Sequence, residues 1–280
     1  AVDTARNSDT TALYIVCQKN YKDIVRLLLS HDGIDVNKAR SSDLTTPLYI
    51  ACQKNHMDIV ELLLAKNRIK VNLTKKNGAG PLYIASQNGH WKIVEALLRH
   101  HEINVNLSRH DGTGSLHIAC ERGYKEIVEA LLLRHEINVN SPRHNGTMPL
   151  FIACHQGHWE IVEALLERHD VDVNSPDLYG GTPLYIASQN GHWKVVEILL
   201  RYQVNVNVNS DGIPSPLYIA SQNGHLEVVK LLLTHPDINV NLKQKTIGSP
   251  FQETALEVAI RIFSNPRSYG EIIVYLVFYG

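Results

Sequence analysis

The chain has 280 residues, of which 44% are hydrophobic and 20% are charged, as is usual for a folded protein. Its formal net charge of −1 at pH 7 provides no global electric field that would draw the protein to DNA or to an anionic membrane. The apolar run at residues 272–278 is far too short to span a bilayer, so no membrane segment is expected.

The sequence repeats itself along its length. Residues 81–99 and 183–201 are identical at 17 of 19 positions. A leucine followed by an aromatic residue or histidine, and then isoleucine, recurs at steps of 33 to 35 residues, and a degenerate eighth copy lies at Leu256. A period of this length indicates an array of stacked supersecondary units. The seven regular copies place this leucine at Leu13, Leu48, Leu82, Leu116, Leu150, Leu184 and Leu217.

Each copy predicts two helices joined by a short turn and followed by a long loop. In the third copy, Pro81 suits the first turn of a helix that ends near residues 88–89. A second helix begins at His90 or Trp91, and residues 93–98 place apolar side chains on one helix face. Neither helix can bury its apolar face alone, so neighbouring copies are expected to stack.

Three stretches carry a family resemblance. TPLYIA at 46–51, SLHIAC at 115–120 and TPLYIAS at 182–188 resemble the first-helix motif TPLHxAA of ankyrin repeats, and NGHWKIVEALL resembles the second-helix motif. The resemblance implies an all-α ankyrin-repeat solenoid, in which helix-turn-helix units are joined by long β-turn-like loops. Seven repeats are expected over residues 1–241, followed over 242–280 by an insertion and a degenerate C-terminal capping repeat.

Cysteine and histidine recur in phase with the copies. Packed helices lie about 8–10 Å apart, whereas a disulfide requires closer backbones, so the cysteines are expected to be buried thiols in a reducing compartment, the cytoplasm or the nucleus. His155 and His158 have the spacing of metal ligands, but they straddle a turn and have no acidic or thiol ligand nearby. No metal or other cofactor is therefore expected. The four cysteines are Cys17, Cys52, Cys120 and Cys154.

An asparagine ends the extended stretch of every regular copy. Asparagine in turns bonds the local backbone, so a ladder of turns is predicted. The resemblance implies a second role, because such asparagines can be substrates of an asparagine hydroxylase. Asn37 and Asn174 fit that context best, each with a leucine eight residues before it and an aspartate two residues before it.

Tryptophan recurs one residue after the histidine that opens the second helix. Other copies have lysine, methionine or leucine at this position, which indicates partial exposure. Two interpretations stay open. The rings pack over the seam between repeats, or Trp159 and Trp193, which lie in adjacent repeats, form a secondary contact patch.

The sequence contains none of the motifs GxSxG, HExxH, P-loop or Rossmann glycine run, so we predict a protein without enzymatic activity. In a repeat array, specificity can be carried by the positions that are free to vary. Here these are the tips of the long loops and the ends of the first helices. By resemblance, both line the concave face that ankyrin repeats use for binding.

The loop tips of repeats 3 to 5 are basic, and this basic row ends at Asp177 and Tyr179. We expect it to bind another protein, specifically an extended acidic or polar peptide, with Tyr179 as an aromatic anchor. The candidate binding residues are Lys75, Lys76, Arg109, His110, Glu121, Arg122, Arg143, His144, His155 and Tyr179.

Two other functions compete with this prediction. The same basic row is a candidate for binding a nucleotide or nucleic acid, although the near-zero net charge argues against it. The array is also a candidate structural spacer within a larger protein. A monomer is expected. The apolar segment EIIVYLVFYG at 271–280 either caps the stack inward or docks onto a further domain.

Overall fold

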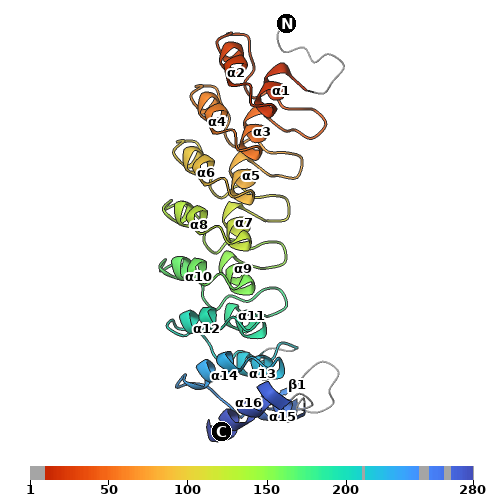
Figure 1. Ribbon diagram of the computed structural model, residues 1–280, viewed down its shortest axis with the longest axis vertical. Coiled ribbons are helices and arrows are strands. Elements are labelled where there is room, and N and C mark those ends of the chain that lie inside the picture. The colour runs from red at the N-terminus through yellow and green to blue at the C-terminus, as the bar shows by residue number, and fades with distance from the viewer. Residues whose placement is uncertain (1–9, 210–211, 246–251, 262–265, 280) are drawn as a thin grey trace. The chain divides into compact units, whose positions relative to one another are not determined.

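A computed structural model describes residues 10–209, 212–245, 252–261 and 266–279. The chain divides into two compact units, Ala1–Asn138 and Val139–Gly280, which we describe separately. Both units are built almost entirely from paired helices (Figure 1). Across the described ranges, every helix is too short or too polar to cross a membrane.

The first unit contains four helix pairs. Within each pair a short turn joins the helices, and a long loop leads to the next pair (Figure 1). The first helices of successive pairs pack against one another, and so do the second helices. The elements are α1 (Ala12–Gln18), α2 (Lys22–Leu29), α3 (Pro47–Gln53), α4 (Met57–Leu64), α5 (Pro81–Gln87), α6 (Trp91–Leu98), α7 (Ser115–Arg122) and α8 (Lys125–Leu132).

The second unit has the same alternation of first and second helices, again packed in two rows. A two-stranded antiparallel ladder precedes its last pair, with Gln244 opposite Glu253 and Lys245 opposite Gln252. The elements are α9 (Pro149–Gln156), α10 (Trp159–Leu166), α11 (Pro183–Gln189), α12 (Trp193–Leu199), α13 (Pro216–Gln222), α14 (Leu226–Leu233), β1 (Gln244–Lys245), β2 (Gln252–Glu253), α15 (Ala255–Arg261) and α16 (Pro266–Tyr279).

Local chemistry explains where the first helices begin. Proline occupies the first turn of five of them, including Pro81 in α5, because its missing N–H is not needed there. Five first helices start after a hydroxyl cap, whose side chain accepts the backbone N–H three residues later. These caps are Thr11, Thr46, Thr182, Ser215 and Thr254.

The core lies between the helices of each pair and between neighbouring pairs. In α6, Ile93, Val94 and Leu97 are completely buried, which confirms the apolar face predicted for this helix. The four cysteines are buried thiols at one recurring position of the first helices. Burial raises the pKa of the Cys17 thiol to about 12, which keeps it protonated and unreactive at neutral pH.

The predicted all-α repeat fold is confirmed, with one local addition. The strands β1 and β2 fall within the expected insertion and follow no repeat pattern. Gln244 is buried and bonds both the N–H and the hydroxyl of Ser215, and Glu253 accepts a hydrogen bond of 3.2 Å from the Tyr218 hydroxyl. These bonds hold the two strands against the start of α13. Residues 246–251 of the insertion lie outside the described residues.

Candidate interaction surface

Three loop-tip cations of the first unit lie over tyrosine rings of the first helices. The Arg40 guanidinium is 5.4 Å from the Tyr14 ring centre, and Lys75 Nζ is 5.5 Å from that of Tyr49. Arg109 lies 5.7 Å from the ring centre of Tyr83 and donates a hydrogen bond of 3.2 Å to its hydroxyl. Each basic side chain is therefore held on an aromatic face.

Acidic residues share these contacts. Arg40 binds both carboxylate oxygens of Asp43, at 2.6 and 3.0 Å, and Lys75 Nζ lies 3.8 Å from the same carboxylate. Arg109 pairs with Asp111 at 3.2 Å. The hydrogen bond from Arg40 holds the pKa of Asp43 well below its usual range, and the Tyr83 hydroxyl raises the pKa of Arg109. Lys75 and Arg109 are therefore partly neutralised within the first unit.

Asp111 is exposed beside Arg109, and the side chains of Lys76 and His110 are exposed as well. Their backbones are fixed, because Lys76 N–H donates to Asp43 O and His110 N–H donates to Asn77 O, each at 3.0 Å. Successive loop tips are thus tied together by main-chain bonds. Glu121 and Arg122 end α7, where Glu121 is half-buried and Arg122 is exposed.

The second unit holds the other four candidates, Arg143, His144, His155 and Tyr179. Arg143 N–H donates to Thr147 O at 3.0 Å and closes its own loop tip, beside the exposed His144. Tyr179 is 77% exposed and its N–H is held by an Asp177 carboxylate oxygen at 2.9 Å. The neighbouring Leu178 is 71% exposed, so this tip is more apolar than Tyr179 alone indicated.

Two residues of this surface, Arg40 and Leu178, were not predicted from the sequence. Arg40 lies in a loop that is one residue longer than the other loops between helix pairs of the first unit, which moved it out of the aligned row. A signal was present, because Arg109 follows Tyr83 by 26 residues and the pairs Tyr14–Arg40 and Tyr49–Lys75 have the same spacing. Leu178 was overlooked because only charged and aromatic tips were considered.

Replacing Asp43 by asparagine is expected to make the first unit less sensitive to acid. The folded pKa of Asp43 lies below its unfolded value of about 3.9, so its carboxylate stabilises the fold above about pH 4. That contribution is lost as the pH falls through the folded pKa. When the pH is lowered from about 7 to about 3, the urea midpoint should therefore decrease less in Asp43→Asn than in the wild type. The exposed Asp32→Asn control should follow the wild type, and an equal fall in all three contradicts the prediction.

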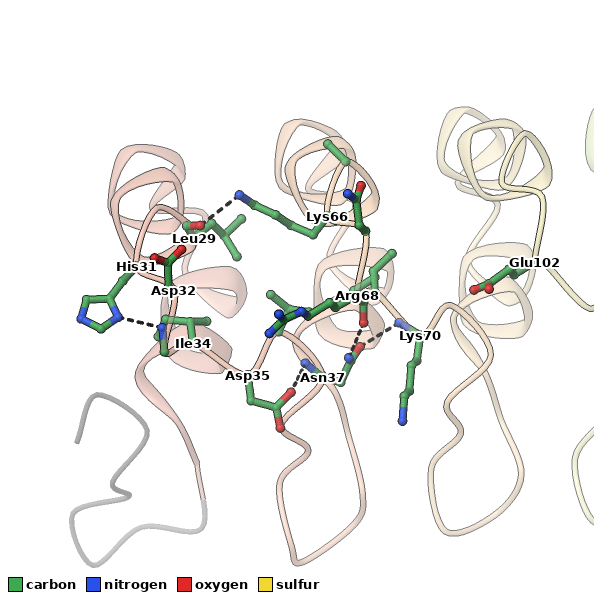
Figure 2. Close-up of a pocket in the computed structure, with 15 residues that line it drawn as sticks. Leu29, His31, Asp32, Ile34, Asp35, Asn37, Lys66, Arg68, Lys70 and Glu102 are labelled. Carbon is green, nitrogen blue, oxygen red and sulfur yellow. Dashed lines mark hydrogen bonds between the residues drawn. The ribbon is translucent and has the colours of Figure 1, made fainter.

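The asparagine ladder differs from the prediction, because the side chains bond the next repeat instead of the local backbone. Figure 2 shows Asn37, whose Nδ2 donates to Arg68 O at 2.7 Å and whose Oδ1 accepts from Lys70 N–H at 2.8 Å. Asn174 does the same with Gln203 and Asn205. The local bond is made instead by the residue two positions earlier, as when Asp35 accepts from Asn37 N–H at 2.9 Å.

This geometry bears on Asn37 and Asn174 as candidates for hydroxylation. Both polar atoms of each amide are already bonded to the following repeat. A hydroxylase that binds the side-chain amide has to displace these hydrogen bonds first. Modification of either residue is therefore expected to require local opening of the repeat.

Replacing Asn72 by alanine is expected to cost about 1–2 kcal/mol, because two backbone groups lose their partner and only water replaces it. Asn72 Nδ2 donates to Glu102 O at 2.6 Å, and Asn104 N–H donates to Asn72 Oδ1 at 2.9 Å. Hydrogen exchange of the Asn104 amide should become faster. Asn67→Ala, at an exposed position two residues before Ile69, is the control. Unchanged protection of Asn104 would count against the ladder.

Histidine side chains form a second set of hydrogen bonds between successive repeats. His192 and His225, which cap α12 and α14, donate from Nε2 to His155 O at 3.0 Å and to Gln189 O at 2.9 Å. His90 reaches Gln53 O in the same way, and His56 uses Nδ1 to reach Cys17 O. These four rings tie α4, α6, α12 and α14 to the first helix of the preceding repeat, as expected for a repeat requirement.

A hollow of about 1040 Å³ lies beside Asn37, between the loop segments that follow α2 and α4 (Figure 2). Its lining mixes Asp32 and Glu102 with Arg68 and Lys70. Lys66 reaches across it and donates to Leu29 O at 2.9 Å, at the end of α2. The mixed charge of the lining and the hydrogen bond from Lys66 to Leu29 O indicate that the hollow is part of the packing between successive repeats.

Two of the tryptophans lie close to one lysine in the second unit. Lys194 Nζ lies 5.0 Å from the Trp159 ring centre and 5.6 Å from that of Trp193. The lysine therefore lies over both rings across the seam between adjacent repeats, while Trp193 stays 44% exposed. Lys194 was not singled out from the sequence, although the lysine directly follows Trp193.

Comparison with known proteins agrees with the repeat geometry. The family model described as ankyrin repeats (3 copies) matches residues 2–75, 66–143 and 116–210, and the model described as ankyrin repeat matches residues 215–245. A search of the curated proteins found no match. The matched segments cover most of the sequence and follow the helix pairs described above. The chain therefore belongs to the ankyrin-repeat family.

Proposed function

We propose that this chain is a non-catalytic scaffold that binds an extended acidic or polar segment of another protein along its loop tips. Ankyrin repeats are generally protein–protein interaction modules, which makes a protein partner the starting point. The observation that carries the finer proposal is the fixed row of tips in the first unit. Main-chain bonds join Lys76 to Asp43 and His110 to Asn77, so a partner meets a row that is already ordered.

Order before binding matters because a rigid surface loses less conformational entropy when a partner binds. Lys75 and Arg109 pack on the buried rings of Tyr49 and Tyr83, which hold these two partly exposed cations in place. Lys76 and His110 add exposed donors beside it. A carboxylate or a backbone carbonyl of an extended chain fits this set, because Lys75, Lys76 and Arg109 are cations and hydrogen-bond donors, while Asp111 places one exposed carboxylate beside Arg109.

The test uses a panel of labelled extended peptides of equal length, rich in glutamate, in serine and glutamine, or in lysine. Fluorescence anisotropy with the full chain should show the tightest binding for the glutamate-rich peptide and the weakest for the lysine-rich one. Lys76→Glu combined with His110→Glu should abolish the preference. Both side chains are exposed, so the thermal melt should not change.

Lys70→Glu is the matched control, because this exposed lysine lies in the same loop as Lys76 but lines the hollow of Figure 2. It should keep the preference for the acidic peptide. Binding that is equal for all peptides, or that survives the double reversal, overturns the proposal. A single-stranded oligonucleotide in the same assay tests the nucleic-acid alternative, which requires a steep fall of affinity with salt.

A further inference from the structure

One exposed leucine has a backbone conformation that is unfavourable for its side chain. Leu44 lies in the loop between α2 and α3, has a φ of +63° and is 44% exposed. In this left-handed region the Cβ atom crowds a neighbouring carbonyl oxygen, so the residues that tolerate it are glycine and asparagine. Every other described residue with a positive φ is a glycine or an asparagine. Leu44 therefore departs from a rule that the rest of the described chain follows.

The following loop tips have glycine at the position of Leu44. Leu44 N–H closes its tip by donating to Arg40 O at 2.7 Å. In the next tip Gly78 N–H donates to Lys75 O at 2.9 Å, and Gly112 has the same role in the tip after that. The two glycines have φ values of +85° and +82°. A leucine that keeps 44% of its surface in water gains only part of the burial energy of a core leucine, so the strained backbone indicates a role outside the stability of the fold.

Leu44 stands beside the row of loop tips that the proposed function uses. It directly follows Asp43, whose backbone oxygen accepts the Lys76 N–H at 3.0 Å. His110 N–H is bonded to Asn77 O in the same way, so the order along the first unit is Leu44, then Lys76, then His110. Packed helices lie about 8–10 Å apart, so two repeat steps from Leu44 to His110 cover about 16–20 Å. An extended chain spans this length with about five or six residues.

The charges near Leu44 favour an acidic ligand. The carboxylate of the adjacent Asp43 pairs with both Arg40, at 2.6 Å, and Lys75, at 3.8 Å. Two cations against one carboxylate leave an excess of positive charge at this end of the row, and the exposed Lys76 adds to it. An aliphatic side chain beside this positive charge is complementary to a segment that carries both an apolar residue and acidic ones.

We propose that the bound segment carries a large aliphatic residue at one end of its acidic run, and that this residue packs on Leu44. The inference rests on the proposed function, because it adds a second feature to the segment bound along the same loop tips. The acidic run lies along Lys76 and His110, while the aliphatic residue covers the exposed part of the leucine. Removing part of two aliphatic side chains from water is expected to strengthen binding about three- to tenfold.

Paired peptides test this inference with the full chain. Each labelled peptide has a run of about six glutamates and one further residue, leucine or serine, placed before the run in one pair and after it in the other. In one of the two pairs, fluorescence anisotropy should show about three- to tenfold tighter binding of the leucine peptide. Leu44→Asn should abolish this gain and keep the affinity for the serine peptide. Its thermal melt should stay close to that of the wild type, because asparagine tolerates the left-handed region, as Asn55 does with a φ of +61°.

Leu133→Asn is the matched control, because this leucine is 86% exposed but lies at the end of α8, away from the loop tips. It should keep the full gain. Equal binding of leucine and serine peptides in both pairs, or a gain that survives Leu44→Asn, overturns the inference and leaves the proposed function standing. A strongly lowered melt of Leu44→Asn also overturns it, because the leucine is then a packing residue. A glutamate run that binds no better than the peptide rich in serine and glutamine overturns the proposed function and this inference with it.

Discussion

Replacing Leu97 by alanine is expected to destabilise the first unit by about 2–5 kcal/mol. Leu97 is 0% exposed in α6, which packs between α4 and α8. The substitution removes buried methyl groups and leaves a cavity that two neighbouring repeats share. Since each repeat is stabilised largely by its neighbours, the loss should spread to α4 and α8. Urea denaturation and hydrogen exchange in α4 and α8 measure both effects.

Leu133→Ala is the control for this prediction, since it makes the same chemical change one residue after α8, where the leucine is 86% exposed. Its effect should stay within about 0.5 kcal/mol. If Leu97→Ala were no more destabilising than Leu133→Ala, the packing of α6 described above would be wrong. If the change in exchange were confined to α6, the coupling between neighbouring repeats would be absent.

Replacing Gly191 by alanine is expected to destabilise the second unit by about 2–4 kcal/mol. Gly191 follows α11 with a φ of +73°, in the left-handed region that alanine adopts only with strain. A Cβ atom here would lie 2.6 Å from Nδ1 of His225. The ring would have to move, and its Nε2 bond to Gln189 O would break.

Gly191→Asn distinguishes the two causes of this loss. Asparagine tolerates the left-handed region, and Asn55 occupies the same place with a φ of +61°. His90 of the next repeat corresponds to His225 and lies beside Asn55 in the repeat pattern. It keeps its bond to Gln53 O at a longer distance of 3.3 Å. The asparagine variant should therefore lose about half as much stability as the alanine variant. Nuclear magnetic resonance of the His225 ring would report the lost bond directly, and a neutral Gly191→Ala would refute the argument.

Most of the fold could be predicted from the repeat period of the sequence. Proline at the first helical turn, the apolar stripe of α6 and the small position of Cys17 are all local signals, and each was found where expected. The insertion behaved differently. The strands β1 and β2 depend on the contact of Gln244 with Ser215, which lies 29 residues earlier in the chain. No short-range sequence pattern predicts a hydrogen bond between residues so far apart in the sequence.

The candidate surface was less predictable for the same reason. The sequence grouped Lys75, Lys76 and Arg109 as equal basic tips, whereas Lys75 and Arg109 lie on tyrosine rings of the preceding repeat and Lys76 does not. Asn72 was expected to bond nearby atoms, yet its partners lie about one repeat away. Contacts between repeats determine which of several similar loop residues remain accessible to a ligand. Those contacts are known only once the repeats are stacked in three dimensions.

The asparagine ladder also has a consequence for how such a gene can change. The bonds from Asn72, Asn106, Asn140 and Asn207 to a later carbonyl oxygen each span 30 residues. Duplication or deletion of one whole repeat therefore leaves every asparagine opposite an equivalent carbonyl. The equivalent bonds from Asn37 and Asn174 span 31 and 29 residues, so the ladder also accommodates a change of one residue between an asparagine and its partner. Whole repeats can thus be gained or lost, and a single copy can change in length by one residue, without loss of the ladder.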